Sequence, residues 1–188
     1  MTSPSPSASP STNSAAPLAT ATPQAVSVRP IVPTQVFVPS IGINAGVEAK
    51  ASQWSKDPHQ GYYAWHYPIP DDMYHVVWWK TGAQLGQPGM AVFMGHHQIG
   101  GFGVFNRLGE LKPGQTAMVE GDGLVIHLQV IAVQANLPKD YPTAFMNAMA
   151  HPPAGARAAF ITCSGTVDGS SHKDNTVVYF AITGATLA

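Results

Sequence analysis

The sequence predicts an all-β domain, because turn residues interrupt it often and its apolar runs are short. Eighteen glycines and seventeen prolines in 188 residues leave little room for long helices. Several apolar runs end at a glycine or a polar loop, as short strands do. Residues 115–137 contain Gly-Asp-Gly between two such runs, which is typical of a tight hairpin. Short strands of this number build a closed barrel or a sandwich.

The expected elements follow this pattern along the chain. Residues 34–50 alternate apolar and polar positions around Pro39 and Gly42, which predicts two short strands joined at a corner. Residues 51–80 are rich in Trp, Tyr, His and Pro, and we expect a long ordered loop there. Further strands are predicted over 89–97, 156–165 and 175–185, and one or two short helices near 105–111 and 143–149.

The N-terminal part differs in composition from the rest. Residues 1–30 consist largely of Ser, Thr, Pro and Ala without aromatic residues, so they bury too little apolar surface to fold and are predicted to be a disordered spacer. One domain of residues 31–188 follows, with its folded unit beginning near Thr34. We find no signal-peptide pattern and no run of about 18 apolar residues, so no segment of this sequence is expected to span a membrane.

Composition excludes several classes of function. Only 10% of the residues are charged and the net charge is −1, which argues against binding to nucleic acid or to anionic lipid. A single cysteine excludes an internal disulfide and paired-thiolate zinc sites. We therefore expect neither a metal nor another cofactor.

The single cysteine, Cys163, ends an apolar run and has two interpretations. Lone cysteines are most often buried and inert. A nucleophilic cysteine needs a nearby imidazole or cation, and His96, which follows Gly95 at the end of another strand, is the natural candidate. Lys173, just before the last strand, would add a cation for an oxyanion. His96 could instead be an ordinary loop histidine, or half of an adventitious His96-His97 metal pair. Lys173 could be a solvated lysine.

Six blocks of the sequence carry a resemblance when they are taken in order. They are VFVPSIGINAGVE (36–48), LGQPGMAVFMGHH (85–97), VFNRLGELKPGQTAMV (104–119), LPKDYPTAFM (137–146), FITCSG (160–165) and HKDNTVVYF (172–180). Together they resemble the sortase family, and most closely the class F sortases of actinobacteria. The resemblance implies a closed β-barrel of about eight strands.

The resemblance also implies a function. It is that of a cysteine transpeptidase, which cleaves a sorting signal of the LPxTG type through a thioester and joins it to an amine of a peptidoglycan precursor. Cys163 would be the nucleophile and His96 the general acid and base. The protein would act at the cell surface, tethered to the membrane by an anchor absent from this chain. Substrate contacts are expected from residues beside the nucleophile and in the block 137–146: Thr162, Ser164, Gly165, Pro138 and Tyr141.

One departure from the family concerns the cation. Lys173 stands where the family has an essential arginine before Asp-Asn, and lysine lacks the planar fork of a guanidinium. None of the three arginines, Arg29, Arg107 and Arg157, occupies that position. Two alternatives therefore stay open: a surface protein of the same fold with weak or lost turnover, and a cysteine hydrolase that uses water as the acceptor.

Overall fold

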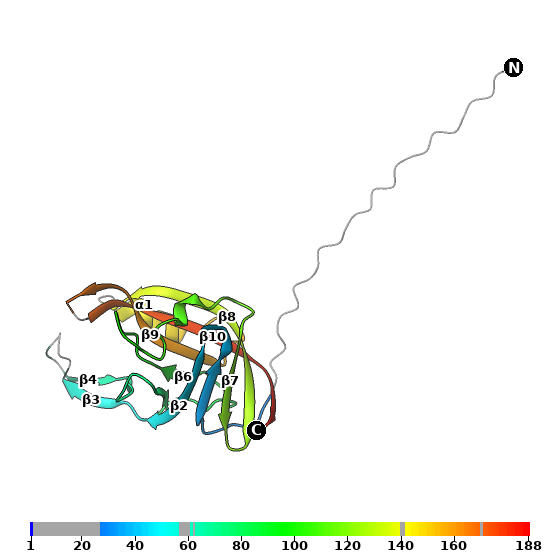
Figure 1. The fold of residues 1–188 in the computed structure, drawn as a ribbon, viewed down its shortest axis with the longest axis horizontal. Coiled ribbons are helices and arrows are strands. Elements are labelled where there is room, and N and C mark those ends of the chain that lie inside the picture. The colour runs from blue at the N-terminus through cyan, green and yellow to red at the C-terminus, as the bar shows by residue number, and fades with distance from the viewer. Residues whose placement is uncertain (2–26, 57–60, 62, 140–141, 170) are drawn as a thin grey trace.

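The structure, a computed structural model, describes residue 1 and residues 27–56, 61, 63–139, 142–169 and 171–188 (Figure 1). Most of the predicted spacer and the predicted substrate contact of Tyr141 lie outside the described residues. Residues before Thr34 also pack against the domain, since Ile31 is buried and its N–H donates to the Leu85 carbonyl at 3.0 Å.

In the described part of the chain, eight strands close into a barrel. They are β1 (Gln35–Val38), β2 (Ile43–Lys50), β5 (Val76–Trp79), β6 (Ala91–Met94), β7 (Thr116–Gly121), β8 (Leu124–Pro138), β9 (Ala158–Asp168) and β10 (Ser171–Leu187). The order around the barrel is β1-β2-β5-β6-β9-β10-β8-β7. The pairs β2-β5 and β6-β9 are parallel, and the other pairs are antiparallel. The predicted closed barrel is confirmed.

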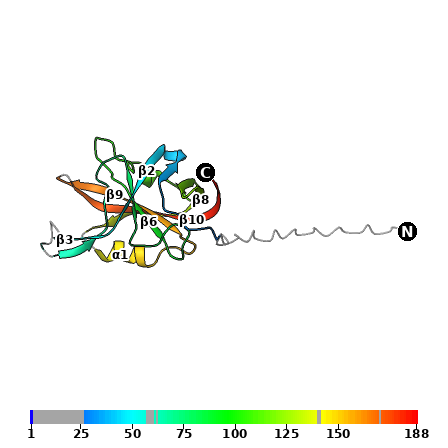
Figure 2. The same ribbon diagram turned by 90° about the horizontal axis from the view of Figure 1, so that it is seen from below.

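The remaining elements are short. Strands β3 (Gln53–Lys56) and β4 (Tyr63–His66) form a separate two-stranded sheet, which extends to one side of the barrel (Figure 1). Helix α1 (Pro142–Ala150) lies along the outside of the barrel (Figure 2), where the Tyr179 hydroxyl donates to the Ala148 carbonyl at 2.8 Å. Two 3₁₀ turns, η1 (Pro39–Ile41) and η2 (Leu108–Glu110), complete the fold. None of the described helices is long and apolar enough to cross a membrane.

Aromatic rings fill the barrel interior around Phe160. The rings of Phe93, Phe105 and Phe180 lie 5.1, 5.6 and 4.5 Å from it, centroid to centroid, and all four side chains are fully buried. Ring pairs at these separations add to the free energy of apolar burial. Strand β6 is buried on both faces, because α1 and its neighbours cover the outside. This explains the uninterrupted apolar run that precedes His96.

Most sequence-based elements are confirmed, and one is wrong. The corner between β1 and β2 contains η1 and Gly42 with a φ of 74°, and the β7–β8 hairpin turns at Asp122 and Gly123. Residues 51–80 are not one loop, since they contain β3, β4 and β5. The short run VVWW forms β5 because it pairs in parallel with β2 and is buried, which is a tertiary contact that local composition does not reveal.

The parallel pairing of β6 with β9 positions the site. Parallel strands end at the same edge of a sheet, so the residues that follow β6 lie beside the second half of β9. The Gly95 N–H donates to the Ile161 carbonyl at 3.1 Å, and the buried Thr162 hydroxyl donates to the Gly95 carbonyl at 2.9 Å. These two bonds fix His96 and Cys163 next to each other in the fold.

Candidate active site

Cys163 and His96 are the two residues that line both of the cavities at this edge of the barrel. One cavity has a volume of about 780 Å³ and the other of about 190 Å³. Cys163 and the imidazole of His96 are each partly buried. The structure therefore brings together the predicted nucleophile and the predicted acid–base group, at a place that a substrate can enter from two sides.

The sulfur of Cys163 has a cationic neighbour. The Lys139 ammonium donates a hydrogen bond to Cys163 Sγ at 3.2 Å, from the residue that directly follows β8. The backbone of Cys163 is also engaged, since Nδ1 of His97 donates to its carbonyl at 2.9 Å. A partly exposed thiol beside an ammonium is the setting of a reactive cysteine rather than of an inert core residue.

The imidazole of His96 is held by a backbone carbonyl. Its Nε2 lies 3.0 Å from the Pro70 oxygen. A carbonyl oxygen only accepts hydrogen bonds, so Nε2 carries the proton and donates it. In the neutral ring Nδ1 is then the nitrogen that accepts a proton. The neighbouring His97 ring instead packs against that of His172, 4.5 Å away between centroids.

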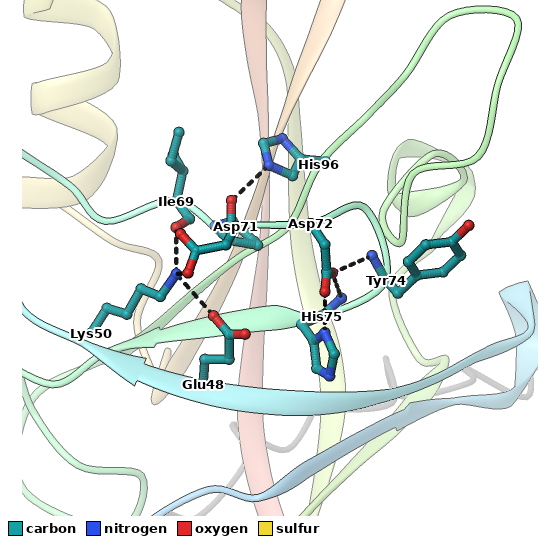
Figure 3. A network of polar contacts seen from close by, with 9 residues as sticks. Glu48, Lys50, Ile69, Asp71, Asp72, Tyr74, His75 and His96 are labelled. Carbon is teal, nitrogen blue, oxygen red and sulfur yellow. Dashed lines mark hydrogen bonds and ion pairs between the residues drawn. The ribbon is translucent and has the colours of Figure 1, made fainter.

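A polar network holds the segment that carries Pro70 (Figure 3). Lys50 on β2 donates to the Ile69 carbonyl at 3.4 Å, and its ammonium lies 2.8 Å from the carboxylate of Asp71 and 2.9 Å from that of Glu48. Burial alone would lower the pKa of Lys50, but the hydrogen bonds to the two carboxylates raise it above its ordinary value. Lys50 is therefore charged at neutral pH and connects β2 to the segment.

Asp72 closes the same segment into a turn. Its Oδ1 accepts the backbone N–H groups of Tyr74 and His75 at 2.8 and 2.9 Å, and its Oδ2 lies 2.7 Å from Nδ1 of His75 (Figure 3). The two backbone hydrogen bonds, with the His75 ring third, lower the pKa of Asp72 from 3.8 to about 2. Glu48, Asp72 and His75 have ligand atoms within 4.8 Å of one another, but the Lys50 ammonium and the His75 ring already occupy the two carboxylates, so we assign no metal to them.

The two cavities differ in chemistry. The smaller one is walled mainly by apolar side chains: Tyr67, Ile69, Pro70, Met94, Phe145 and Ile161. Burial raises the pKa of Tyr67, which keeps that phenol neutral. The larger cavity carries polar side chains, among them His97, Gln98, Lys139 and His172. The smaller cavity suits an apolar peptide segment, and the larger one suits a polar or ionisable group.

The predicted substrate-binding residues lie at different distances from the site. Thr162 lines the smaller cavity, although its hydroxyl is already bonded to Gly95. Ser164 has a buried hydroxyl oxygen without a partner among the described residues, and Gly165 has a φ of 77° with the Asp174 carboxylate where a Cβ would be. Ser164, Gly165 and the exposed Pro138 line neither cavity.

Lys173 is not one of the residues that line the two cavities. Its side chain is exposed, and its carbonyl accepts the N–H of Lys139 at 2.9 Å. The residue of β10 directly across from Cys163 is Asn175, because the register shifts between His172 and Asp174. Arg107 and Arg157 line neither cavity. Arg107 pairs with Glu110 at 2.7 Å, and Arg157 donates to the Gln87 carbonyl at 3.1 Å.

Sequence reasoning missed Lys139, the residue that contacts the sulfur. The block 137–146 was expected to contact the substrate, but Lys139 within it was not singled out. One signal was available, because a lysine beside the prolines of this block is unusual in a chain with only nine lysines and arginines. No sequence pattern indicates that Asn175 lies opposite Cys163, since this depends on the β9–β10 register.

Comparisons with known proteins identify the family and the fold. A family model described as Sortase domain matches residues 36–182. Among solved structures, sortase E1 from Streptomyces coelicolor with a tripeptide in the active site is similar at a TM-score of 0.58 and 11% identity, over 82% of this chain and 90% of that one. Sortase A of Listeria monocytogenes is similar at a TM-score of 0.57 and 13% identity, over 85% of this chain and 92% of that one.

A third similar structure is sortase C-3 from Streptococcus pneumoniae, with a TM-score of 0.54 and 17% identity over 86% of this chain and 67% of that one. At these identities the structural likeness speaks for the fold. No curated protein sequence is significantly similar to the chain.

Proposed function

The chain belongs to the sortase family, and we propose that it is a cysteine transpeptidase in which Cys163 is the nucleophile and His96 the general acid and base. One observation carries the assignment of the residues: Cys163 and His96 are the two that line both cavities. Covalent catalysis needs a nucleophile and a proton-transfer group at the same opening. The block LPKDYPTAFM favours class F within the family.

The chemistry follows from the two side chains. The Cys163 thiolate attacks a backbone carbonyl of the donor peptide and forms a tetrahedral oxyanion. The C–N bond then breaks, and protonated His96 gives its Nδ1 proton to the departing amine. A thioester remains on Cys163. The neutral His96 next accepts a proton from the incoming amine as that amine attacks the thioester, and the thiolate is released with the new amide.

The two cavities divide the substrates. We assign the apolar, smaller cavity to the side chains of a sorting signal of the LPxTG type that precede the cleaved bond. The polar, larger cavity would admit the acceptor, an amine of a peptidoglycan precursor. The tripeptide in the active site of the Streptomyces coelicolor structure supports a peptide as donor. This substrate pair would place the protein at the cell surface, held by a membrane tether.

The other residues named from the sequence have supporting roles in this proposal. Thr162 forms part of the wall of the smaller cavity and ties β9 to Gly95, which fixes that wall. Ser164 and Gly165 shape the strand after the nucleophile, and substrate contacts of Pro138 and Tyr141 stay predictions from the sequence.

The decisive experiment incubates the protein with an LPxTG-type peptide and triglycine and follows masses. We expect a thioester adduct on Cys163 and a peptide–triglycine amide, both of which Cys163→Ala abolishes. Release of free acid that triglycine does not divert would identify a hydrolase instead. Binding of the peptide without any adduct would identify a surface binding protein of the same fold. His97→Ala serves as the matched histidine control.

A further inference from the structure

A positive charge beside Cys163 would stabilise both the thiolate and the oxyanion of the proposed reaction. The register of the sheet bears on which residue can supply it. Leu137 on β8 lies across from Asn175 on β10, and Asn175 lies across from Cys163 on β9. These three residues therefore form one row on one face of the sheet. Lys139 follows Leu137 by two positions, so its side chain starts from the same face.

The backbone of Lys139, the residue directly after β8, is tied to β10. Its N–H donates to the Lys173 carbonyl at 2.9 Å and continues the β8–β10 pairing. Its partly buried side chain lines the larger cavity and ends 3.2 Å from Cys163 Sγ. The Lys139 side chain therefore starts from a backbone position that the sheet holds.

The other cations considered from the sequence are less well placed. Lys173 has an exposed side chain that lines neither cavity, and it lies at the shift in the β9–β10 register. Arg107 and Arg157 are engaged with Glu110 and with the Gln87 carbonyl. Among the described residues, Lys139 is the lysine or arginine that lines a cavity together with Cys163.

We propose that Lys139, and not Lys173, supplies the positive charge that the reaction needs. Its ammonium stabilises the Cys163 thiolate before attack. When the sulfur bonds to the donor carbonyl, the negative charge moves from Sγ to the carbonyl oxygen. The ammonium lies close enough to follow that charge and stabilise the oxyanion, and it keeps its own proton throughout. This inference rests on the proposed function, since it names the cation of the same site.

Alkylation of Cys163 by iodoacetamide tests the first step without any peptide. Iodoacetamide is neutral, so its rate reports the thiolate rather than attraction of the reagent to the lysine. At pH 7 we expect Lys139→Met to be alkylated at least about tenfold more slowly than the wild type. At about pH 10, above the ordinary range of a free thiol, the difference should disappear. A purely structural effect would persist at both pH values.

Other ionisable groups around the thiol must be the same in all variants. They are His96 and His97 after β6, and His172 and Asp174 on β10. Because these are unchanged, a difference between variants reports residue 139. Lys139→Arg, which keeps a positive charge, should restore at least part of the alkylation rate at pH 7 and also shows whether the position tolerates substitution.

Lys173→Met is the matched control, because it removes a lysine from the neighbouring strand. We expect its alkylation rate to stay within about twofold of wild type, as for most surface substitutions. Ligation of the peptide to triglycine should fall by about 10²–10³-fold in kcat/KM for Lys139→Met, as when an oxyanion donor is removed. A loss in Lys173→Met with a normal Lys139→Met would overturn the proposal.

The two readouts separate failure of this inference from failure of the proposed function. If alkylation depends on Lys139 but the protein ligates no peptide, the inference about Lys139 stands and the transpeptidase function is rejected. If Lys139→Met ligates the peptide at the wild-type rate, the inference about Lys139 is rejected and the transpeptidase function stands. If Lys139→Met does not fold, Lys139→Gln takes its place in both assays.

Discussion

The middle of β9, which carries Cys163, pairs through its backbone with β10 at Cys163 itself and with β6 up to Ile161, two residues earlier. The segment 69–72 that holds the His96 ring is attached differently. Its contacts are the carbonyl of Pro70, the ammonium of Lys50 and the turn closed by Asp72. Backbone pairing within a barrel is cooperative and buried, whereas partly exposed side-chain pairs each contribute little free energy. The nucleophile is therefore rigidly placed, and the imidazole depends on contacts that single substitutions, salt and pH can weaken.

The largest effect is expected when the imidazole of His96 is removed. His96→Ala should lower kcat/KM for ligation by about 10²–10⁴-fold, the usual contribution of a general acid–base group. His97→Ala removes a hydrogen bond to the Cys163 carbonyl, which the backbone pairing of β9 already positions, so most activity should remain. Steady-state kinetics of both variants measures the two losses in kcat/KM. Equal losses would mean that the two histidines act as one unit and that the backbone alone does not place Cys163.

A smaller effect is expected when the network of the segment 69–72 is broken. Lys50→Met removes the contacts to Ile69, Asp71 and Glu48 together, and exposed pairs are worth about 0.2–1 kcal/mol each, so we expect kcat/KM to fall about threefold to tenfold. The rate of alkylation of Cys163 at pH 7 should not change, because the network does not reach the sulfur.

Two further measurements sharpen the test of Lys50. The wild type should lose part of its activity at high salt, which screens exposed ion pairs, and Lys50→Met should lose less. Lys112→Met, at an exposed lysine between η2 and β7, is the control for a lost surface charge. Slower alkylation in Lys50→Met would show that Cys163 and His96 are not positioned independently.

The same difference explains how much of the molecule the sequence could predict. Cys163 and His96 were found because each comes after a largely apolar run, a pattern that backbone pairing of buried strands imposes on the sequence. The Lys139 contact was not found, because it depends on the register of β8 against β10. The role of Lys50 was not found either, since its partners come from residues 69–72, in a region whose composition gives no periodic signal.

The smallest expected effect concerns Asp72 and its dependence on pH. Hydrogen bonds from the backbone N–H groups of Tyr74 and His75 lower the pKa of Asp72 to about 2 from an ordinary 3.8. A carboxyl group whose pKa is lower in the folded state stabilises that state above the ordinary value, and this contribution is lost as the pH falls through the lowered value. Asp72→Ala should therefore lower Tm slightly at pH 5–7, and the difference from wild type should shrink between about pH 4 and pH 2. Thermal unfolding of both proteins across this range, followed by circular dichroism, measures it. A difference that stayed constant with pH would mean that the side chain acts through packing, and that the turn before β5 holds the Pro70 carbonyl without help from the Asp72 charge.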